Sequence, residues 1–407
     1  MEEKENMENM DNMEKKVGET IVSSGKKGSI RGGVIVLAAV LTVFMTVCSC
    51  VSRNMGELPS REEKEKFSRL SHYKNGRFEN EEMVKFFPKE KRKKRSRLGM
   101  FRFLFKSPNA PEWDLPKVHL SPADFSGKKD MFSVRWLGHS SLVFELAGAR
   151  FMTDPVFGNA APVLGVVCRY TENPMKISEL PELDFVLISH DHYDHLEYDF
   201  IRAIRFKKFP IVTALGVGAR LRSWGIASSR IRELGWNDSV TIGNTRITAV
   251  PSRHFSGRSW ADRFQTLWAS YVIESLPEKD SGMESKKIFF GADSGYGKQF
   301  AAAGKKYGPF DLVCLEIDAW NENWPYNHMF PGEMPPAFRD LKGKLFLPIH
   351  WGVFDLAMHK WDHSIMEIVR LAKENNIPCI TPLMGEKVDL TGKELPQKEW
   401  WKKSGKQ

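Results

Sequence analysis

Cysteine is scarce in this chain of 407 residues, and its spacing excludes several kinds of small domain. Cys48 and Cys50 lie together near the amino terminus, whereas Cys168, Cys314 and Cys379 are far apart. Three scattered cysteines cannot build a disulfide framework, and they lack the paired spacing of a structural zinc cluster. We therefore expect a fold held together by a hydrophobic core, for which the chain is long enough.

Long apolar runs are also lacking, with one exception, and no internal repeat is visible. The exception is the uncharged run from Val34 to Val51, 18 residues that follow Lys26, Lys27 and Arg31. This order is typical of an export signal or a membrane anchor, and the length is at the lower limit for a helix that spans a bilayer.

The end of this run resembles a bacterial lipobox. Ser49, a small residue, precedes Cys50, which would become the lipidated first residue after cleavage. We therefore expect residues 1–50 to be a signal segment that attaches a lipoprotein to a membrane of the bacterial cell envelope. A single uncleaved transmembrane anchor is the alternative.

Acidic residues are outnumbered, with 51 Asp and Glu against 60 Lys and Arg, so the formal net charge is +9. A surplus of this sign usually indicates nucleic acid, an anionic membrane or an anionic substrate as partner. The stretch from Lys85 to Lys106 holds ten basic residues and one acid, so it alone accounts for a net charge of +9. The remaining residues are neutral as a set.

The basic residues of this stretch, mainly Lys91 to Arg97, are followed by an apolar segment rich in phenylalanine. This pairing suits an anionic membrane surface, because the cations engage phosphates while the rings enter the interface. A solvated charge run that docks on the main domain is the alternative. Nucleic-acid binding is not expected, since no nucleic-acid module accompanies the stretch. We expect residues 51–130 to be a linker of irregular structure that contains it.

Short apolar runs separated by turns begin at Met131 and indicate an α/β or α+β enzyme domain over residues 131–395. One run, Phe185 to Ile188, is followed by the sequence HDHYDH, residues 190–195. In an extended chain His190 and His192 point to the same side and can chelate one ion. A helix that starts near Tyr193 would present the next Asp and His to a second ion. Such ligands favour zinc, with iron or manganese as alternatives.

HDHYDH matches the HxHxDH signature of the metallo-β-lactamase superfamily. Five further segments make the chain resemble its N-acyl-phosphatidylethanolamine phospholipase D branch, which is near the lactonase branch with a similar GHSS opening. The resemblance spans about residues 134–356 and implies a four-layer αββα sandwich, an α/β fold (α+β in some schemes) with helices outside two packed sheets. The segments are GHSSLVFEL (138–146), TDPVF (153–157), ISELPELD (177–184), YGPFDL (307–312) and PIHWG (348–352).

The resemblance also implies a metal centre with two zinc ions, which would activate a bridging hydroxide as the nucleophile. Its ligands would be His190, His192 and His254 for one ion, Asp194, His195 and His350 for the other, and Asp293 bridging both. Among these ligands, Asp194 and Asp293 are also candidate catalytic residues.

Three further residues are expected around this centre. His328, in YNHMFPGE, falls where relatives place a histidine near the metals, and would bind phosphate or protonate the leaving alkoxide; shaping the pocket is the alternative. Asp154 and His139 are candidates to hydrogen-bond the metal ligands, since a zinc-bound imidazole normally donates its second N–H. Satisfying a local turn is the alternative for both.

The resemblance predicts phospholipase D-type hydrolysis of an N-acyl-phosphatidylethanolamine-like phospholipid or a related small molecule at a membrane surface. A lactone or ester hydrolase is the alternative, because the same hydroxide attacks a carbonyl carbon. A membrane-tethered protein without catalysis is the non-enzyme alternative, and the complete ligand set argues against it. One departure weakens the phospholipid assignment: Asp318 and Glu322 stand where phospholipase relatives carry a Gly-Ala-Tyr-like stretch and an arginine.

Overall fold

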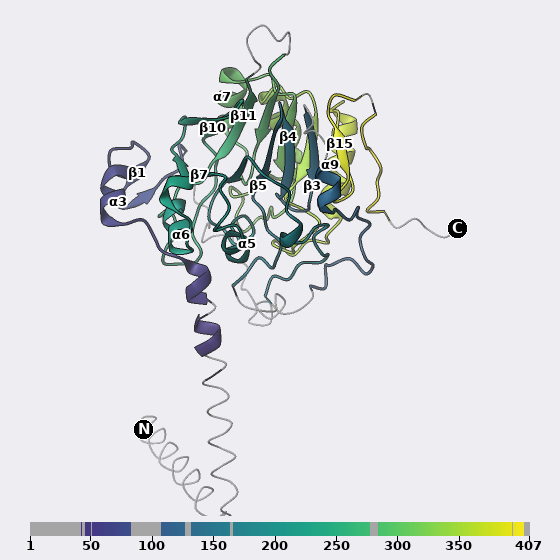
Figure 1. The fold of residues 1–407 in the computed structure, drawn as a ribbon. Helices are drawn as coiled ribbons and strands as arrows, with labels where there is room; N and C mark the ends of the chain where they lie inside the picture. Colours follow the sequence, from purple (N-terminus) through teal and green to yellow (C-terminus); the bar gives the residue numbers. More distant parts are fainter. Residues whose placement is uncertain are drawn as a thin grey trace, which may run out of the picture. The chain divides into compact units, whose positions relative to one another are not determined.

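A computed structural model describes residues 42, 45–49, 51–82, 107–126, 132–162, 166–276, 284–392 and 394–402 of the chain. The chain forms two compact units, residues 1–52 and 53–407, and the elements below belong to the second (Figure 1). Cys50, most of the apolar run and the whole basic stretch 85–106 lie outside the described residues, so their roles stay predictions. Among the residues that the structure describes, no helix is long and apolar enough to cross a bilayer.

The first large sheet has seven strands in the order β15-β3-β4-β5-β6-β7-β8. It is antiparallel from β15 to β5 and parallel from β5 to β8. All four side chains of β6 are buried, as expected for a strand covered on both faces. The strands are β3 (Phe132–Trp136), β4 (Leu142–Leu146), β5 (Ala149–Thr153), β6 (Phe185–Ile188), β7 (Ile211–Ala214), β8 (Ile231–Leu234) and β15 (Lys387–Asp389).

The second large sheet has six strands in the order β14-β13-β12-β11-β10-β9. Strands β9 to β12 pair antiparallel, and β12, β13 and β14 run parallel to one another. The strands are β9 (Ser239–Ile242), β10 (Thr245–Val250), β11 (Ser270–Ser275), β12 (Lys287–Phe290), β13 (Leu312–Glu316) and β14 (Phe346–Ile349).

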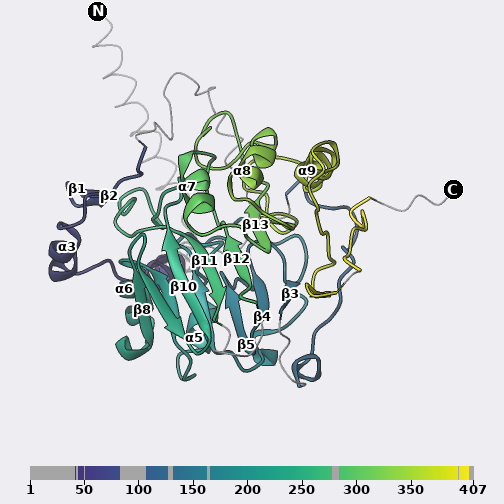
Figure 2. The same cartoon turned by 90° about the horizontal axis from the view of Figure 1, so that it is seen from above.

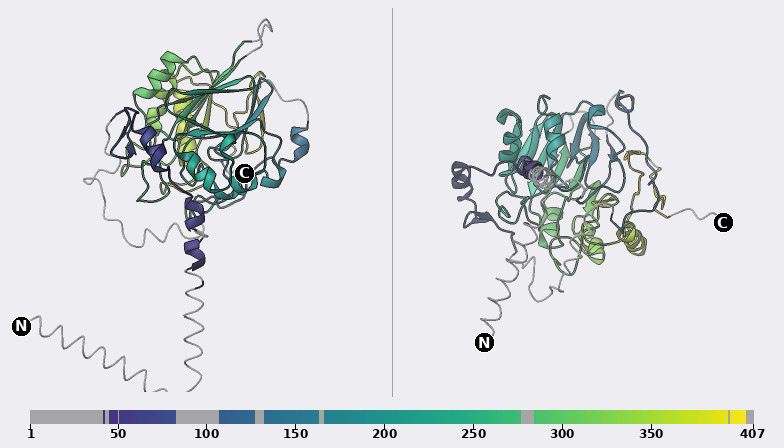
Figure 3. Two further views of the ribbon diagram at one scale, coloured as in Figure 1. Left: turned by 60° about the vertical axis from the view of Figure 1, so that its left-hand side comes forward. Right: turned by 90° about the horizontal axis from the view of Figure 1, so that it is seen from below.

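Helices lie outside the two sheets (Figures 2 and 3). On the six-stranded sheet, Phe300 of α7 packs on Phe289 of β12, and Phe338 of α8 packs on Phe346 of β14, each pair with ring centroids 6.1 Å apart. On the other sheet, α6 packs on β7 and β8. The four-layer α/β sandwich predicted from the sequence is confirmed. Its helices are α5 (Tyr198–Ala203), α6 (Val217–Ser223), α7 (Lys298–Lys306), α8 (Met334–Asp340) and α9 (His363–Glu374), with short 3-10 turns at Pro122–Phe125, Ile177–Glu179, Ser228–Arg230 and Pro331–Glu333.

The segment before the sandwich differs from the irregular linker that we expected. It contains helix α3 (Arg61–Phe67), which Ser60 and Glu63 close with a capping box, and a hairpin of β1 (Tyr73–Lys74) and β2 (Arg77–Phe78). Apolar packing explains why this segment is ordered, because Phe67 and Phe78 are buried and their ring centroids lie 5.3 Å apart. The described part of residues 53–82 is therefore an integral piece of the second unit.

The parallel strands of both sheets end at the edge where the predicted ligands occur in the sequence. Residues 189–195 follow β6, Asp293 follows β12, and His350 follows β14 directly. Because the carboxyl ends of parallel strands meet at one edge, loops that are far apart in the sequence converge there, and such edges are where ligands bind in open α/β sheets.

Candidate metal centre

HDHYDH forms a tight turn after β6. The amides of His195 and Leu196 both donate to the carbonyl of His192, at 3.2 and 2.9 Å, and α5 begins only at Tyr198. A helix therefore does not start near Tyr193, which was one way for the sequence to present the next Asp and His to a second ion. The turn achieves the same separation of side chains, because it brings the first two histidines into one cluster and the following Asp and His into another.

A buried cation explains why a turn forms here. The guanidinium of Arg258 donates to the carbonyls of Asp191 and Leu196, at 2.9 and 2.8 Å, so these carbonyls are occupied by a side chain and not by helical amides. The Asp191 carboxylate in turn accepts from Arg220 Nε at 2.7 Å and from the Gly257 amide at 2.7 Å. Asp191 thus connects the turn to Arg220 and Gly257 by hydrogen bonds and belongs to neither cluster.

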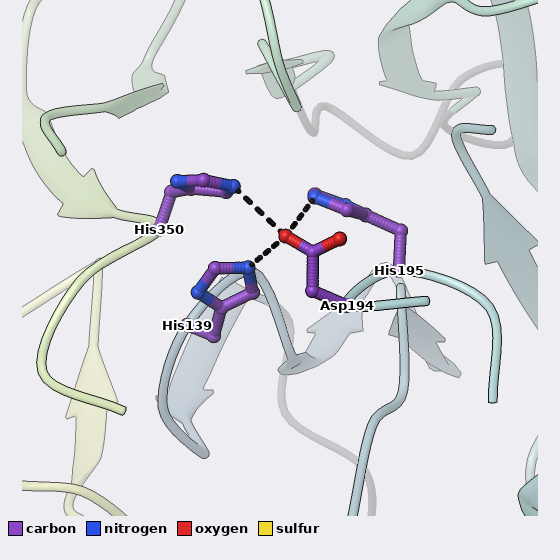
Figure 4. A group of neighbouring side chains, drawn as sticks. All are labelled: His139, Asp194, His195 and His350. Atoms are coloured by element: carbon purple, nitrogen blue, oxygen red, sulfur yellow. Dashed lines mark hydrogen bonds and ion pairs between the residues drawn. The ribbon is translucent and has the colours of Figure 1, made fainter. Parts of the chain in front are cut away.

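Four side chains make up the Asp194 cluster: His139, Asp194, His195 and His350 (Figure 4). One carboxylate oxygen, Asp194 Oδ2, lies 3.0 Å from His139 Nε2 and 3.4 Å from both His195 Nε2 and His350 Nε2. Three imidazoles from three different loops therefore converge on one buried carboxylate.

Three histidines make up the His192 cluster: His190, His192 and His254. Nδ1 of His192 lies 2.8 Å from His190 Nε2 and 3.2 Å from His254 Nε2. Two nitrogens bound to one tetrahedral zinc at about 2.0–2.1 Å would be about 3.3 Å apart, so the spacing is that of a shared ion.

Asp293 joins the two clusters. Its Oδ1 lies 3.1 Å from both His195 Nε2 and His350 Nε2, and its Oδ2 lies 3.9 Å from His190 Nε2 and 3.5 Å from His254 Nε2. Each oxygen of this carboxylate therefore faces a different set of histidines, which is the arrangement of a bridging ligand.

The nitrogen atoms that face each other in the clusters are better suited to bind a cation than to hydrogen-bond one another. His190 Nδ1 contacts Ser189 Oγ at 2.9 Å and His254 Nδ1 contacts the Asn327 carbonyl at 3.0 Å, which leaves their Nε2 lone pairs directed at His192. In the described part of the chain, His195 Nε2, His350 Nε2 and Asp293 Oδ1 are buried without a hydrogen bond. Buried polar atoms without partners are costly, and a metal ion at each cluster would satisfy them.

The two clusters hold protons differently. Burial and the neighbouring imidazoles keep the pKa of His190 well below its usual value, and burial lowers the pKa of His192 and of His254 to about 3. Burial also disfavours the charged form of His350, but Asp293 and Asp194 outweigh it and raise its pKa to about 10. The same carboxylates outweigh burial at His195, whose pKa lies well above the usual value.

Backbone strain accompanies these positions. His139, Asp154 and His350 have φ angles of 52°, 36° and 66°, in the left-handed region that residues with a Cβ rarely adopt. Such conformations cost about 1–3 kcal/mol each and cluster at functional sites. Here they turn three side chains toward the centre from the ends of strands.

Asp154 lies directly behind the ligands. Its Oδ2 accepts from His195 Nδ1 at 2.7 Å and from Ser189 Oγ at 2.6 Å, while its Oδ1 accepts from the Ser189 amide at 2.7 Å. Ser189 also contacts His190, so one buried carboxylate fixes a histidine of each cluster. Asp154 and His139 thus both lie in contact with predicted ligands.

Asn80, which the sequence analysis missed, holds the loop of His254. Its Nδ2 donates to the His254 carbonyl at 2.8 Å, and its Oδ1 accepts from the His254 amide at 3.1 Å. A side chain from the segment expected to be a linker therefore fixes the backbone of a predicted ligand. No local sequence signal marks it, since the two residues are 174 positions apart.

Glu316 is the second residue that was missed. It is the last residue of β13, it is buried, and its Oε2 contacts His328 Nδ1 and lies 4.0 Å from His350 Nδ1. Its Oε1 accepts from the amides of Ser294 and Met329, each at 3.1 Å. An acid at the end of an otherwise apolar strand was the available signal. His328 therefore lies beside the centre, at 5.1 Å between its ring centroid and that of His254.

Comparison with known families and proteins agrees with this geometry. Residues 149–351 match the family model described as a beta-lactamase superfamily domain. An uncharacterized protein of Mycobacterium tuberculosis is 36% identical over 338 residues, which cover 81% of this chain and 87% of the relative. N-acyl-phosphatidylethanolamine-hydrolyzing phospholipase D 1 of Caenorhabditis elegans is 31% identical over 259 residues, which cover 60% of this chain and 69% of the relative.

Among solved structures, an isothiocyanate hydrolase from Delia radicum gut bacteria is similar in fold. Its TM-score is 0.51 at 19% sequence identity, and the match covers 63% of this chain and 98% of that chain. At this level of identity the likeness concerns the fold.

Proposed function

Because the chain belongs to the metallo-β-lactamase superfamily and is a metal-dependent hydrolase of that fold, we propose that it is a phospholipase D-type phosphodiesterase. Its substrates would be phospholipids like N-acyl-phosphatidylethanolamine, which would yield phosphatidic acid and an N-acylethanolamine. The observation that carries the hydrolytic site is the placement of Asp293, whose two oxygens face separate histidine clusters. The substrate class is supported by the relative from C. elegans.

We assign two zinc ions to the two clusters. His190, His192 and His254 would hold one ion, Asp194, His195 and His350 the other, and Asp293 would contribute one oxygen to each. Bound divalent ions supply a water that ionises near neutral pH and an electrophilic contact for phosphoryl oxygens. The imidazoles of the His192 cluster are neutral at pH 7 and ready to ligate, because burial keeps their pKa values low.

His139 and Asp154 would act on the ligands and not on the metals. His139 Nε2 lies 3.0 Å from Asp194 Oδ2, and burial lowers its pKa to about 3, so the ring is neutral and donates an N–H to that carboxylate. Asp154 accepts from His195 Nδ1 and thereby fixes the tautomer that presents Nε2 to the centre.

His328 and Glu316 form a pair that can hold a proton at the edge of the site. Burial and the nearby Asp293 raise the pKa of Glu316 well above its usual value, so its carboxyl is protonated and donates to His328 Nδ1. Burial lowers the pKa of His328 to about 4, so the neutral ring carries its own proton on Nε2. This N–H would donate to a phosphoryl oxygen or to the leaving alkoxide.

We also propose attachment to a membrane through the amino-terminal segment, as a lipoprotein modified at Cys50 or through an uncleaved anchor. The apolar run and its preceding cations support this placement. A membrane-attached enzyme would meet a phospholipid substrate where that substrate resides.

Hydrolysis of a lactone or another neutral ester is the second candidate. The observation that favours it is Asp318, a buried carboxylate two residues beyond Glu316 that accepts from Ser364 Oγ at 2.9 Å. An additional acidic residue in the loop after β13, which also carries Glu316, opposes an anionic phosphodiester more than a neutral ester.

The test compares substrates and metal content in one purified preparation. Wild-type protein is analysed for bound metal and then assayed with N-acyl-phosphatidylethanolamine, simple phosphodiesters and lactones, beside Asp293→Asn and a matched control, Asp311→Asn. Asp311 pairs with the exposed Lys344 and accepts from the Lys287 amide, and it belongs to neither cluster, so its variant should retain the turnover of wild type. We expect about two metal ions per wild-type chain and a loss of about 10³-fold in turnover for Asp293→Asn. Full turnover in that variant would exclude the bridging role, and hydrolysis of lactones alone would replace the phospholipase assignment by the second candidate.

A further inference from the structure

The residues that follow α5 expose an aromatic side chain among cations. Phe206 is 85% exposed, the largest value for a large apolar side chain among the described residues. The guanidinium carbon of Arg205 lies 4.4 Å from the centroid of its ring. We name Arg202, Arg205, Phe206, Lys207 and Lys208 the α5 patch.

Among the described residues, no acidic side chain forms an ion pair with the cations of the α5 patch, Arg202, Arg205, Lys207 and Lys208. Arg222, by contrast, is neutralised by Glu63 and Glu233. Four cations without an ion pair, near in sequence to an exposed phenylalanine, match a layer of anionic headgroups above an apolar interior.

The position of the α5 patch relates it to the amino-terminal segment. The indole of Trp224 donates to the carbonyl of Arg53 at 2.9 Å. The next residue, Gly225, borders the side chains of Arg202 and Arg205, each 3.8 Å from the place of a Cβ on this glycine. Helices α5 and α6 accordingly lie near each other in Figure 1. The α5 patch is therefore adjacent to the point where the second unit begins.

Chain continuity extends this relation to the apolar run. Val51, the last residue of the run, precedes Arg53 by two residues, and consecutive Cα atoms are about 3.8 Å apart, so the run ends within about 8 Å of Arg53. The surfaces of the second unit around Arg53, among them the α5 patch, are therefore the candidates for a second membrane contact.

We propose that the α5 patch is a docking surface for the anionic membrane to which the amino-terminal segment attaches the protein. Phe206 would enter the interface and the four cations would face lipid phosphates. The proposal rests on the membrane attachment put forward above, and it adds a defined second contact. Met55, close to Arg53, accepts a hydrogen bond from Tyr193 of the HDHYDH turn at 3.3 Å, so docking on this side would hold the predicted centre near the lipid.

The experiment measures partition of the full chain onto vesicles of phosphatidylcholine, without and with about one-third phosphatidylglycerol. Wild type is compared with Phe206→Ala, with the double variant Lys207→Ala/Lys208→Ala, and with Lys305→Ala/Lys306→Ala as a matched control. The control lysines are also adjacent, exposed and close to a helix end, in α7. Thermal melting verifies that all four proteins are folded.

We expect both lysine variants to bind neutral vesicles as wild type does, through the amino-terminal segment, whereas Phe206→Ala should bind both kinds of vesicle more weakly because it loses the ring that enters the interface. Anionic lipid should strengthen binding of wild type and control, and the double variant should lose about fivefold of that gain for each lysine removed, a difference that salt abolishes. Equal gains in wild type and double variant would overturn the α5 patch, as would be found if the patch served a protein or a nucleic acid. Failure of wild type to bind neutral vesicles would instead overturn the attachment itself.

Discussion

The two clusters that Asp293 joins contain similar residues and differ in charge. The His192 cluster has three imidazoles and no carboxylate of its own, and burial keeps these rings neutral. The Asp194 cluster adds a carboxylate, which together with Asp293 raises the pKa of His350 to about 10 and that of His195 well above its usual value. The first cluster is thus prepared for a cation, whereas the second already holds protons in its place.

An additional carboxylate therefore decides whether protons compete with a metal ion for the histidines of a site. A metal ion that enters the Asp194 cluster must displace protons, and the neutral rings of the His192 cluster have none to displace. Ligand identity alone would not reveal this, because the distinction arises from the placement of Asp293 Oδ1 and Asp194 Oδ2 beside the same two rings, those of His195 and His350. Removing the negative charge of Asp194 tests this difference between the two clusters.

The largest effect is expected from Asp194→Asn set against His192→Ala. Each variant should lose one of two metal ions and about 10³-fold in turnover, because a bridged nucleophile needs both ions. Metal analysis with hydrolysis assays provides the measurement. The two variants should differ in one respect: the metal that remains in Asp194→Asn should bind independently of pH. If both variants retained two ions, the assignment of ligands to clusters would be wrong.

The pH dependence of metal binding is the next effect in size. In the metal-free protein, His350 is protonated below pH of about 10 and His195 is protonated as well, so an ion competes with two protons at the Asp194 cluster. Affinity there should fall by about 100-fold for each pH unit between 8 and 6, about tenfold per proton. The pKa values of about 3 at His192 and His254 predict a flat profile at the other cluster over the same range. Isothermal titration with zinc in buffers of different ionisation enthalpy counts the released protons, and equal release at both clusters would contradict the comparison.

The sequence predicts this centre well where the signal is local. HDHYDH supplies ligands of both clusters within six residues, and His254, Asp293 and His350 each come within four residues of the end of an apolar strand. A strand that ends at the shared edge places such residues together whatever the details of packing. The alternation of apolar runs and turns indicates an α/β or α+β domain, and the four-layer sandwich is implied by the family resemblance of the motifs.

What the sequence does not predict depends on packing between distant segments. Asn80 reaches the backbone of His254, and Phe67 and Phe78 fold a segment that composition alone presents as a charged linker. Glu316 ends a strand whose other residues are apolar, which marks it as unusual in the sequence, but only its contact with His328 shows that it belongs to the site. The turn at Tyr193 likewise depends on Arg258, which arrives from another loop.

Asp154→Asn should have a smaller effect on zinc affinity, and the effect should differ between the two clusters. The amide can still accept from His195 Nδ1, but it removes the charge that fixes this tautomer, and changes in such supporting groups cost about 10–100-fold in metal affinity. The loss should fall mainly on the Asp194 cluster, because His190 contacts Asp154 only through Ser189. Zinc titration of the variant measures both affinities, and an equal loss at the two clusters would show that Ser189 transmits the change.

Asn80→Ala is expected to have the smallest effect and the opposite preference. Its two hydrogen bonds position the backbone of His254, so their loss should weaken the His192 cluster by about tenfold in zinc affinity and leave the Asp194 cluster unchanged. Asn80→Asp makes a matched variant, since it keeps the acceptor for the His254 amide and loses the donor to the carbonyl. An intermediate affinity for Asn80→Asp would show that each bond contributes separately. Weaker binding at both clusters would instead mean that the whole segment 53–82 has loosened, and unfolding measured by circular dichroism at equal metal saturation would distinguish this from a local effect on His254.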